Sequence, residues 1–167
     1  MAAKFDIDVD ELTEVLGPAA VCVFGVGNRQ RRDDGVGSMI AGRLANRLGQ
    51  WAVDAGAVPE NHLEKVARLG PKTVLLIDAV DFSGIPGEAR LMEPNQIANP
   101  ALSTHALSLR MTADYLRARI RADLILLAIQ PVDLGRGEGL SAKVSHTARH
   151  LEGLLASFIR AERKSDL

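Results

Sequence analysis

The chain contains few of the residues that commonly decide the class of a protein. Its 167 residues include one cysteine, one tryptophan and one tyrosine, and its acidic and basic side chains nearly cancel to a formal charge of −1. A single cysteine cannot form an internal disulfide, and Cys22 lies within an apolar run that predicts a small buried side chain. Without a basic excess, nothing in the charge balance favours a nucleic-acid partner, and we expect none.

Long apolar runs are also missing. No stretch of about twenty apolar residues, which a membrane-spanning helix requires, occurs in the sequence. Residues 1–10 are acidic and lack the apolar segment of a secretory signal. We therefore expect a protein that works in the cytoplasm, without a membrane partner.

The overall make-up is that of a folded protein. Hydrophobic residues are 47% of the chain and charged residues 25%, which is typical of a globular domain and not of a disordered segment. The length suits one ordinary domain. We expect a single domain over residues 1–167, in which residues 1–18 form an N-terminal extension with a short helix that ends before Gly17-Pro18.

Beyond residue 18, apolar runs alternate with segments of helical periodicity. Strands that alternate with helices of about ten or more residues favour an α/β fold in three layers, with a mostly parallel, twisted, five-stranded sheet and helices on both faces. The fourth strand is short and is expected at or near an edge of the sheet. The pattern predicts strands at 20–25, 51–54, 73–78, 88–92 and 123–129, and helices at 34–48, 60–69, 104–119 and 141–162.

Two segments carry finer expectations. Leu107, Met111 and Tyr115 recur at every fourth position, which predicts that they share the apolar face of the helix at 104–119. Residues 133–139 are rich in glycine and are expected to be mobile.

The loop after the first predicted strand, Gly25 to Gly37, begins like a dinucleotide-binding loop. The G-x-G-x-x-G pattern fails, because Gln30 occupies the third glycine position. Asp33 and Asp34 stand at the start of the next helix, where carboxylates would repel a phosphate and attract a cation. One aspartate suffices to cap a helix, so the second indicates a further role, with capping by the pair as the structural alternative.

Two other segments place polar groups next to strands or helix starts. Asp78 directly ends the apolar strand 73–78, and Asp81 is expected in the following turn. In Ser103-Thr104-His105, the imidazole lies at the start of a helix, where the helix dipole disfavours its protonated form. A neutral imidazole is the form that binds a transition metal. The structural alternatives are a strand terminator for Asp78 and a packed or solvated histidine for His105.

The three side chains are expected to meet. Because the carboxyl ends of parallel strands lie at one edge of a sheet, Asp34, Asp78 and His105 should project into the same crevice. Two carboxylates and an imidazole suit a borderline divalent ion such as nickel or zinc. The sequence therefore predicts that these residues recognise a metal and carry the activity.

The remaining nucleophiles and histidines are weaker candidates. His62 lies at a helix start, and His146 and His150 form an i, i+4 pair that is expected to face solvent on the last helix. Neither the HExxH motif of zinc proteases nor the Gly-x-Ser-x-Gly motif of serine hydrolases occurs. Covalent acyl-enzyme chemistry is not expected.

The same residues carry a resemblance to the hydrogenase maturation endopeptidases, the proteases that process the large subunit of [NiFe]-hydrogenases. The chain is most similar to the branch that serves hydrogenases of the formate-hydrogenlyase type. The motifs run in order over most of the chain, and their order and spacing are more specific than any one of them. They are Gly25-Val26-Gly27-Asn28, Asp33-Asp34-Gly35-Val36-Gly37, Val58-Pro59-Glu60-Asn61, Ile77-Asp78-Ala79-Val80-Asp81, Ser103-Thr104-His105 and Ile129-Gln130-Pro131.

The resemblance implies a function and a partner. It implies an endopeptidase that removes the C-terminal extension of a [NiFe]-hydrogenase large-subunit precursor after nickel has been inserted. Asp34, Asp78 and His105 match the nickel-recognising positions of the family. The metal would be substrate-borne nickel, with other divalent cations as possible replacements, and it would act as a template or as a Lewis acid.

Some residues depart from the family pattern. Ser38-Met39 stands where other residues are expected, and Arg29, Arg31 and Arg32 make the first loop basic. The arginines either contact acidic groups of the precursor or form a solvated surface.

Two other classes of α/β protein remain as alternatives. A receiver domain also has paired acids after its first strand and an aspartate after its third, but it needs a lysine at the end of its fifth strand, where this chain has Ile129-Gln130-Pro131. A nucleotide-binding module is weakened by Gln30 and by the paired aspartates.

Overall fold

The computed structural model describes residues 7–17, 20–97 and 103–165. Five strands form one sheet: β1 (Val21–Val26), β2 (Ala52–Gly56), β3 (Thr73–Ala79), β4 (Ala89–Met92) and β5 (Asp123–Ile129). Five α-helices are α1 (Val9–Leu16), α2 (Val36–Leu48), α3 (Leu63–Leu69), α4 (Ala106–Ile120) and α5 (Ala142–Ser165). Short 3₁₀ turns are η1 (Arg32–Gly35), η2 (Gly49–Trp51), η3 (Pro59–His62) and η4 (Pro94–Gln96).

The sheet is mostly parallel, as the sequence predicts. Its strand order is β2-β1-β3-β5-β4, and only β4 is antiparallel, at the edge next to β5. The chain leaves β1 toward β2 on one side and returns to β3 on the other side. The carboxyl ends of β1 and β3 therefore flank a topological switch point, where α/β sheets bind ligands.

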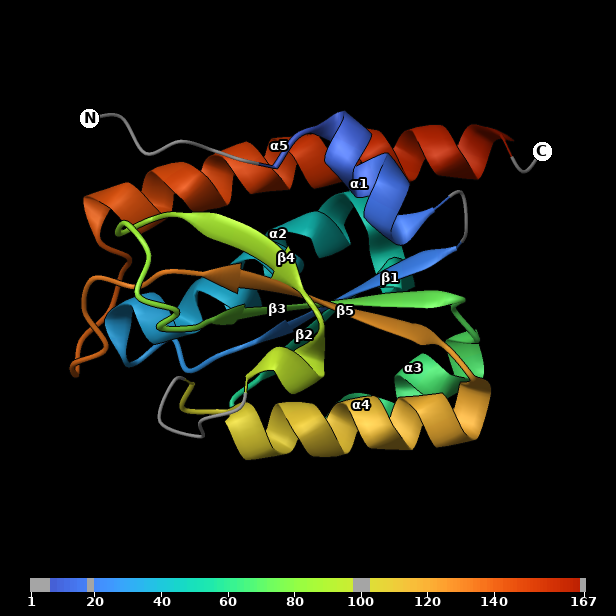
Figure 1. Cartoon of the computed structure of the whole chain (residues 1–167), viewed down its shortest axis with the longest axis horizontal. Coiled ribbons are helices and arrows are strands. Elements are labelled where there is room, and N and C mark those ends of the chain that lie inside the picture. Colours follow the sequence, from blue (N-terminus) through green and yellow to red (C-terminus); the bar gives the residue numbers. More distant parts are fainter. Residues whose placement is uncertain (1–6, 18–19, 98–102, 166–167) are drawn as a thin grey trace.

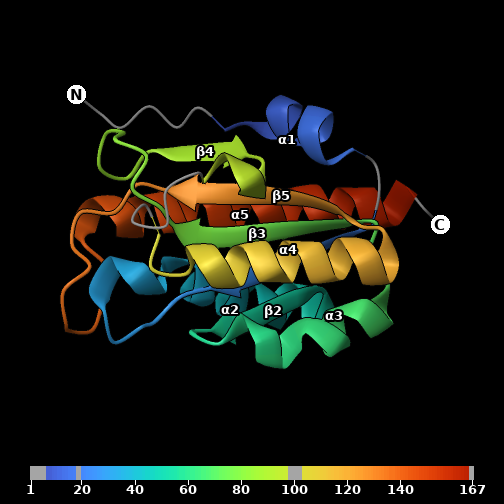
Figure 2. The same cartoon turned by 60° about the horizontal axis from the view of Figure 1, so that its bottom comes forward.

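Helices cover both faces of the sheet and give three layers (Figures 1 and 2). Helices α1, α2 and α5 lie on one face, and α3 and α4 lie on the other. Side chains alternate along β3, so that Leu75 and Ile77 join the first core while Val74 and Leu76 join the second. By the same alternation Asp78 faces the side of α4, which is the side from which His105 comes.

The lone cysteine is a core residue. Cys22 is fully buried in β1 and packs in the second core. Burial raises the pKa of its thiol to about 12, with a small opposing effect from Lys65. The prediction of a small buried side chain is confirmed. In the described residues, no helix has the length and apolar character that crossing a membrane would require.

The predicted apolar face of α4 is wrong. Leu107 is 70% exposed, Met111 54% and Tyr115 37%, so the large residues point away from the core. The buried face is formed by Ala106, Leu109, Thr112, Ala113 and Leu116. These residues recur at spacings of three and four, and Leu109 and Leu116 supply the large apolar side chains that pack in the second core.

The glycine-rich segment after β5 is anchored. Asp33 accepts hydrogen bonds from the backbone N–H groups of Val132, Asp133 and Ser141 and from the hydroxyl of Ser141, at 2.7–3.0 Å. The expectation of a mobile segment considered only its glycine content. A buried carboxylate from the β1 loop holds both ends of the segment in place.

Candidate functional site

Asp34 is brought to the carboxyl edge of β1 by the turn η1. Its side chain is buried, and its Oδ2 accepts a hydrogen bond from the backbone N–H of Asn28 at 3.2 Å. Neither Asp33 nor Asp34 caps its own helix, because η1 has no side-chain cap and α2 begins at Val36. The two aspartates thus have different contacts. Asp33 binds the segment after β5, whereas Asp34 faces Thr104 and His105.

Asp78 is the second-last residue of β3, and it is completely buried. Its Oδ2 accepts a hydrogen bond of 2.7 Å from the hydroxyl of Ser103. Its Oδ1 has no hydrogen-bond partner and lies 3.4 Å from Nδ1 of His105. Burial, opposed by His105 and Ser103, raises the pKa of the Asp78 carboxyl group above its usual range.

His105 precedes the first residue of α4 and is 9% exposed. His105 does not follow β4 directly. Because β4 is antiparallel to β5, β4 begins at the edge where the parallel strands have their carboxyl ends, and it ends at the opposite edge. The route from β4 back to the edge passes through η4 and through residues outside the described part of the chain. The expectation that the histidine follows a parallel strand end is corrected, although the histidine does reach the predicted edge.

The hydroxyl of Thr104 fixes the tautomer of the imidazole. It donates to Oδ1 of Asp34 at 2.6 Å and lies 3.0 Å from Nδ1 of His105. An ionised carboxylate only accepts hydrogen bonds, so the Thr104 hydrogen is committed to Asp34 and the Thr104 oxygen accepts from Nδ1. Nδ1 therefore carries a hydrogen, and in the neutral ring Nε2 keeps its lone pair.

The imidazole lies between the two carboxylates. Nε2 is 3.9 Å from Oδ2 of Asp34 on one side, and Nδ1 is 3.4 Å from Oδ1 of Asp78 on the other. Burial lowers the pKa of His105, but the nearby carboxylates of Asp78 and Asp34 outweigh it and raise the pKa above its ordinary value. The structure thus brings together the three residues that the sequence singled out.

A metal ion would find two donors side by side here. Two atoms that each bind one ion at about 2.1 Å are at most about 4.2 Å apart, so Nε2 and Oδ2 of Asp34, at 3.9 Å, are within this limit. Asp78 lies closer to the other ring nitrogen, Nδ1. Within the described residues, no group of three or more carboxylate, imidazole or thiolate side chains is arranged to hold a metal by itself.

Ser103 and Thr104 belong to the Ser103-Thr104-His105 motif, but the sequence predicted no role for either of them. Ser103 links Asp78 to the backbone N–H of His105, which it accepts at 3.1 Å, and Thr104 links His105 to Asp34. Hydroxyl side chains directly before a candidate metal ligand are the signal that could have identified them, because ligand histidines are commonly oriented by such hydrogen bonds.

A hollow of about 510 Å³ lies between the loop after β1, at Asn28, and the end of β2. Arg29 spans its wall: it donates to the hydroxyl and the backbone oxygen of Ser38 and pairs with Asp54 at 2.7 Å. Arg32 pairs with Asp133 at 3.5 Å. Two of the three loop arginines are therefore engaged within the protein, and Ser38, unexpected from the family pattern, is part of the same network.

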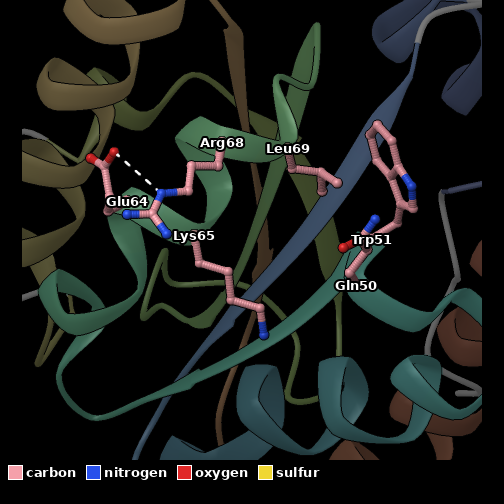
Figure 3. A pocket seen from close by; sticks show the side chains of 6 residues that line it. All are labelled: Gln50, Trp51, Glu64, Lys65, Arg68 and Leu69. Carbon is pink, nitrogen blue, oxygen red and sulfur yellow. Dashed lines mark ion pairs between the residues drawn. The ribbon is translucent and has the colours of Figure 1, made fainter.

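The other candidates lie apart from these three side chains. Asp81 occupies a turn, as expected, where it accepts from Ser83 N–H and from the Gln130 side chain. His146 and His150 are exposed on α5, and His62 lines the hollow near Asn28. A second hollow, of about 600 Å³, lies at the opposite edge between η2 and α3 and holds none of the predicted site residues (Figure 3).

Comparisons with known proteins identify a family with this fold. The sequence model of a family described as hydrogenase maturation protease matches residues 40–157, a range that includes Asp78 and His105 and begins after Asp34. The hydrogenase 3 maturation protease of Escherichia coli K12 is 37% identical over 113 residues, which are 66% of this chain and 72% of that protein.

Solved structures show the same fold. The [NiFe] hydrogenase maturation protease of Thermococcus kodakarensis superposes with a TM-score of 0.80 at 30% identity, over 90% of this chain and 99% of that one. The hydrogenase maturating endopeptidase HybD of Escherichia coli gives a TM-score of 0.69 at 25% identity, over 87% of this chain and 93% of that one.

Proposed function

The chain belongs to the hydrogenase maturation protease family, and on that premise we propose that it removes the C-terminal extension of a [NiFe]-hydrogenase large-subunit precursor once nickel has been inserted. It is a peptidase of α/β fold, so neither a receiver domain nor a nucleotide-binding module describes it. The proposed partner is the precursor, and the proposed place of action is the cytoplasm.

The observation that carries the proposal is the donor pair at the carboxyl edge. In the neutral form of His105, Nε2 has a lone pair beside Oδ2 of Asp34, and Thr104 contacts both side chains. An arriving cation would displace the proton that the raised pKa of His105 favours. A nickel ion that arrives in the substrate already has ligands of its own. It needs only a few further donors, and Nε2 of His105 and Oδ2 of Asp34 supply two that are 3.9 Å apart.

Asp78 has a supporting position in this proposal. Its Oδ1 is buried and lacks a hydrogen bond, which is a costly state for a carboxylate oxygen. A cation bound on the imidazole would lower this cost, because it adds positive charge to a buried group that lies between two acids. Asp34, Asp78 and His105 are thus proposed to recognise the substrate-borne nickel together, with other divalent cations as possible replacements.

The proposal is tested by mixing the purified protein with nickel-loaded and nickel-free precursor and following the loss of a short tail by mass spectrometry. We expect processing of the loaded form only. Asp34→Ala, Asp78→Ala and His105→Ala should each lower the rate by about a hundredfold or more. Asp10→Ala, which removes an exposed carboxylate from α1, is the control and should process normally.

Two results would contradict the proposal. Equal processing of loaded and nickel-free precursor would exclude recognition of nickel. Normal processing by all three site variants would show that the activity resides elsewhere on the protein.

A further inference from the structure

Exposed apolar side chains gather around the site. Eight large apolar residues are exposed in the described part of the chain, and only Val9 and Val15 belong to α1, on the far face of the sheet. The other six lie on α4 or in loops at the carboxyl edge. They are Val58, Ile85, Leu107, Met111, Tyr115 and Val132.

Three of these residues form a continuous line, which we call the α4 stripe: Leu107, Met111 and Tyr115. Successive members are one turn apart, so the stripe runs about 12 Å along the helix. The core does not need it, because α4 packs on the sheet through its opposite face. Single exposed apolar residues are ordinary, whereas a line of them on one helix marks a contact surface.

The stripe begins at the site itself. Leu107 is two residues from His105, so their Cα atoms are at most about 7 Å apart. Its side chain is 70% exposed, the largest value among the eight. A macromolecule that brings a metal to Nε2 of His105 therefore covers Leu107 as well, and Met111 lies one turn beyond.

Three arginines of α4 are engaged within the protein. Arg110 donates to the backbone oxygen of Ile97 at 2.8 Å, Arg117 lies 3.8 Å from Glu93, and Arg119 lies 3.6 Å from Glu64. Glu64 also accepts a hydrogen bond from the Tyr115 hydroxyl at 2.9 Å. Asp114, between Met111 and Tyr115, is also exposed, so α4 offers a partner a line of apolar side chains beside one carboxylate.

We propose that the α4 stripe, from Leu107 to Tyr115, is the surface on which the metal-loaded precursor docks through an apolar patch next to its metal centre. This inference rests on the proposed function. A stable protein interface covers about 800 Å² on each partner, far more than three polar side chains supply, so the precursor must contact the surface that borders them. Leu107, the first residue of the stripe, is the most exposed large apolar residue in the described part of the chain.

The test is the steady-state processing of nickel-loaded precursor by Leu107→Asp and Met111→Glu variants. Aspartate is favourable in the first turn of a helix and glutamate in the middle, so both variants should fold. We expect KM to rise about fivefold to thirtyfold for Leu107→Asp, the range of an important interface residue, while kcat stays within about twofold. The matched control is Val9→Asp, which changes an exposed aliphatic residue in the first turn of α1.

The outcomes separate this inference from the proposed function. If the wild-type protein processes the loaded precursor and Leu107→Asp has an unchanged KM, the docking surface is wrong while the protease assignment stands. If the wild type does not process the precursor at all, the proposed function fails first. Gel filtration adds a third outcome: loss of a wild-type dimer in Leu107→Asp, with KM unchanged, would assign the stripe to a second copy of the chain and overturn the proposal.

Discussion

At the scale of single residues, Asp78 combines complete burial with a carboxyl oxygen that has no hydrogen bond. Burial raises the pKa of this group in the folded state. Because the folded-state pKa is raised, the free energy of unfolding decreases as the pH rises above the pKa that the group has in the unfolded chain. The decrease is complete above the folded-state pKa, where the buried carboxyl group is charged. The fold thus tolerates Asp78 at neutral pH at some cost, which is common where a residue serves function.

Replacing the carboxylate with a neutral isostere should reveal this cost. Asp78→Asn keeps the shape and the contact with Ser103 but carries no charge to bury. We expect a melting temperature equal to or a few degrees above that of the wild type at pH 7, together with strongly reduced processing. Thermal unfolding followed by circular dichroism gives the first quantity. A melting temperature clearly below that of the wild type would show that the charged form stabilises the fold.

The sequence allowed Asp34, Asp78 and His105 to be identified, because each stands beside a strand end or a helix start. Their arrangement could not be predicted. The imidazole lies close to both carboxylates, and Thr104 sets its tautomer. Both features depend on interatomic distances that must be correct to within a few tenths of an ångström. The order of residues along the chain carries no information at that scale.

At the scale of elements, the position of α2 depends on contact between backbones. A methyl group at Gly37 would overlap the carbonyl oxygen of Ile77 in β3, and one at Gly25 in β1 would overlap that of Gly37. Only glycine lets the first turn of α2 lie directly on the sheet. Because η1 joins β1 to this turn, the same close approach places Asp34 at the switch point.

Gly37→Ala should therefore lower the free energy of unfolding by about 1 to 3 kcal/mol or more through overpacking. The matched change is Gly153→Ala in α5, where the new methyl group meets nothing within 4 Å. It should raise the free energy of unfolding by about 0.5 to 1 kcal/mol, because alanine favours a helix over glycine. Urea denaturation measures both variants. A destabilisation of similar size in both would mean that close packing at Gly37 is not the cause.

The elements themselves were largely predictable, since the strands and helices follow apolar runs and helical periodicity. The errors occurred where tertiary packing outweighs local pattern. Ala106 and Ala113 on α4 pack against the sheet in place of the larger Leu107 and Met111. The direction of β4 could not be known, because pairing with β5 is a contact between residues far apart in sequence.

At the scale of the whole molecule, α1 is part of the core. Ile7, Leu12 and Leu16 are buried in the first core, and α1 packs against α5. The helix itself was predicted, but its apolar face could not be assigned a partner from the sequence. That residues 1–167 form one domain, with residues 1–18 as an N-terminal extension, stays a prediction.

Removing residues 1–17 should lower the melting temperature and leave the rate of processing at low temperature nearly unchanged, because α1 lies on the face opposite α4 and His105 (Figure 1). Leu12→Ala alone should cost about 2 to 5 kcal/mol of unfolding free energy. Val15→Ala, on the exposed side of α1, should change it by less than about 0.5 kcal/mol. A truncated protein with an unchanged melting temperature would show that α1 is a true appendage.

The strand order has a consequence for how the protein is made. All three site residues leave the ribosome before β5, yet β5 is inserted between β3 and β4 and is the only partner of β4. Until residues 123–129 are synthesised, the nascent chain exposes one edge of β3 and an unpaired β4, and such edges invite pairing with other chains. The sheet that carries the site residues is therefore completed only once residues 123–129 have been synthesised.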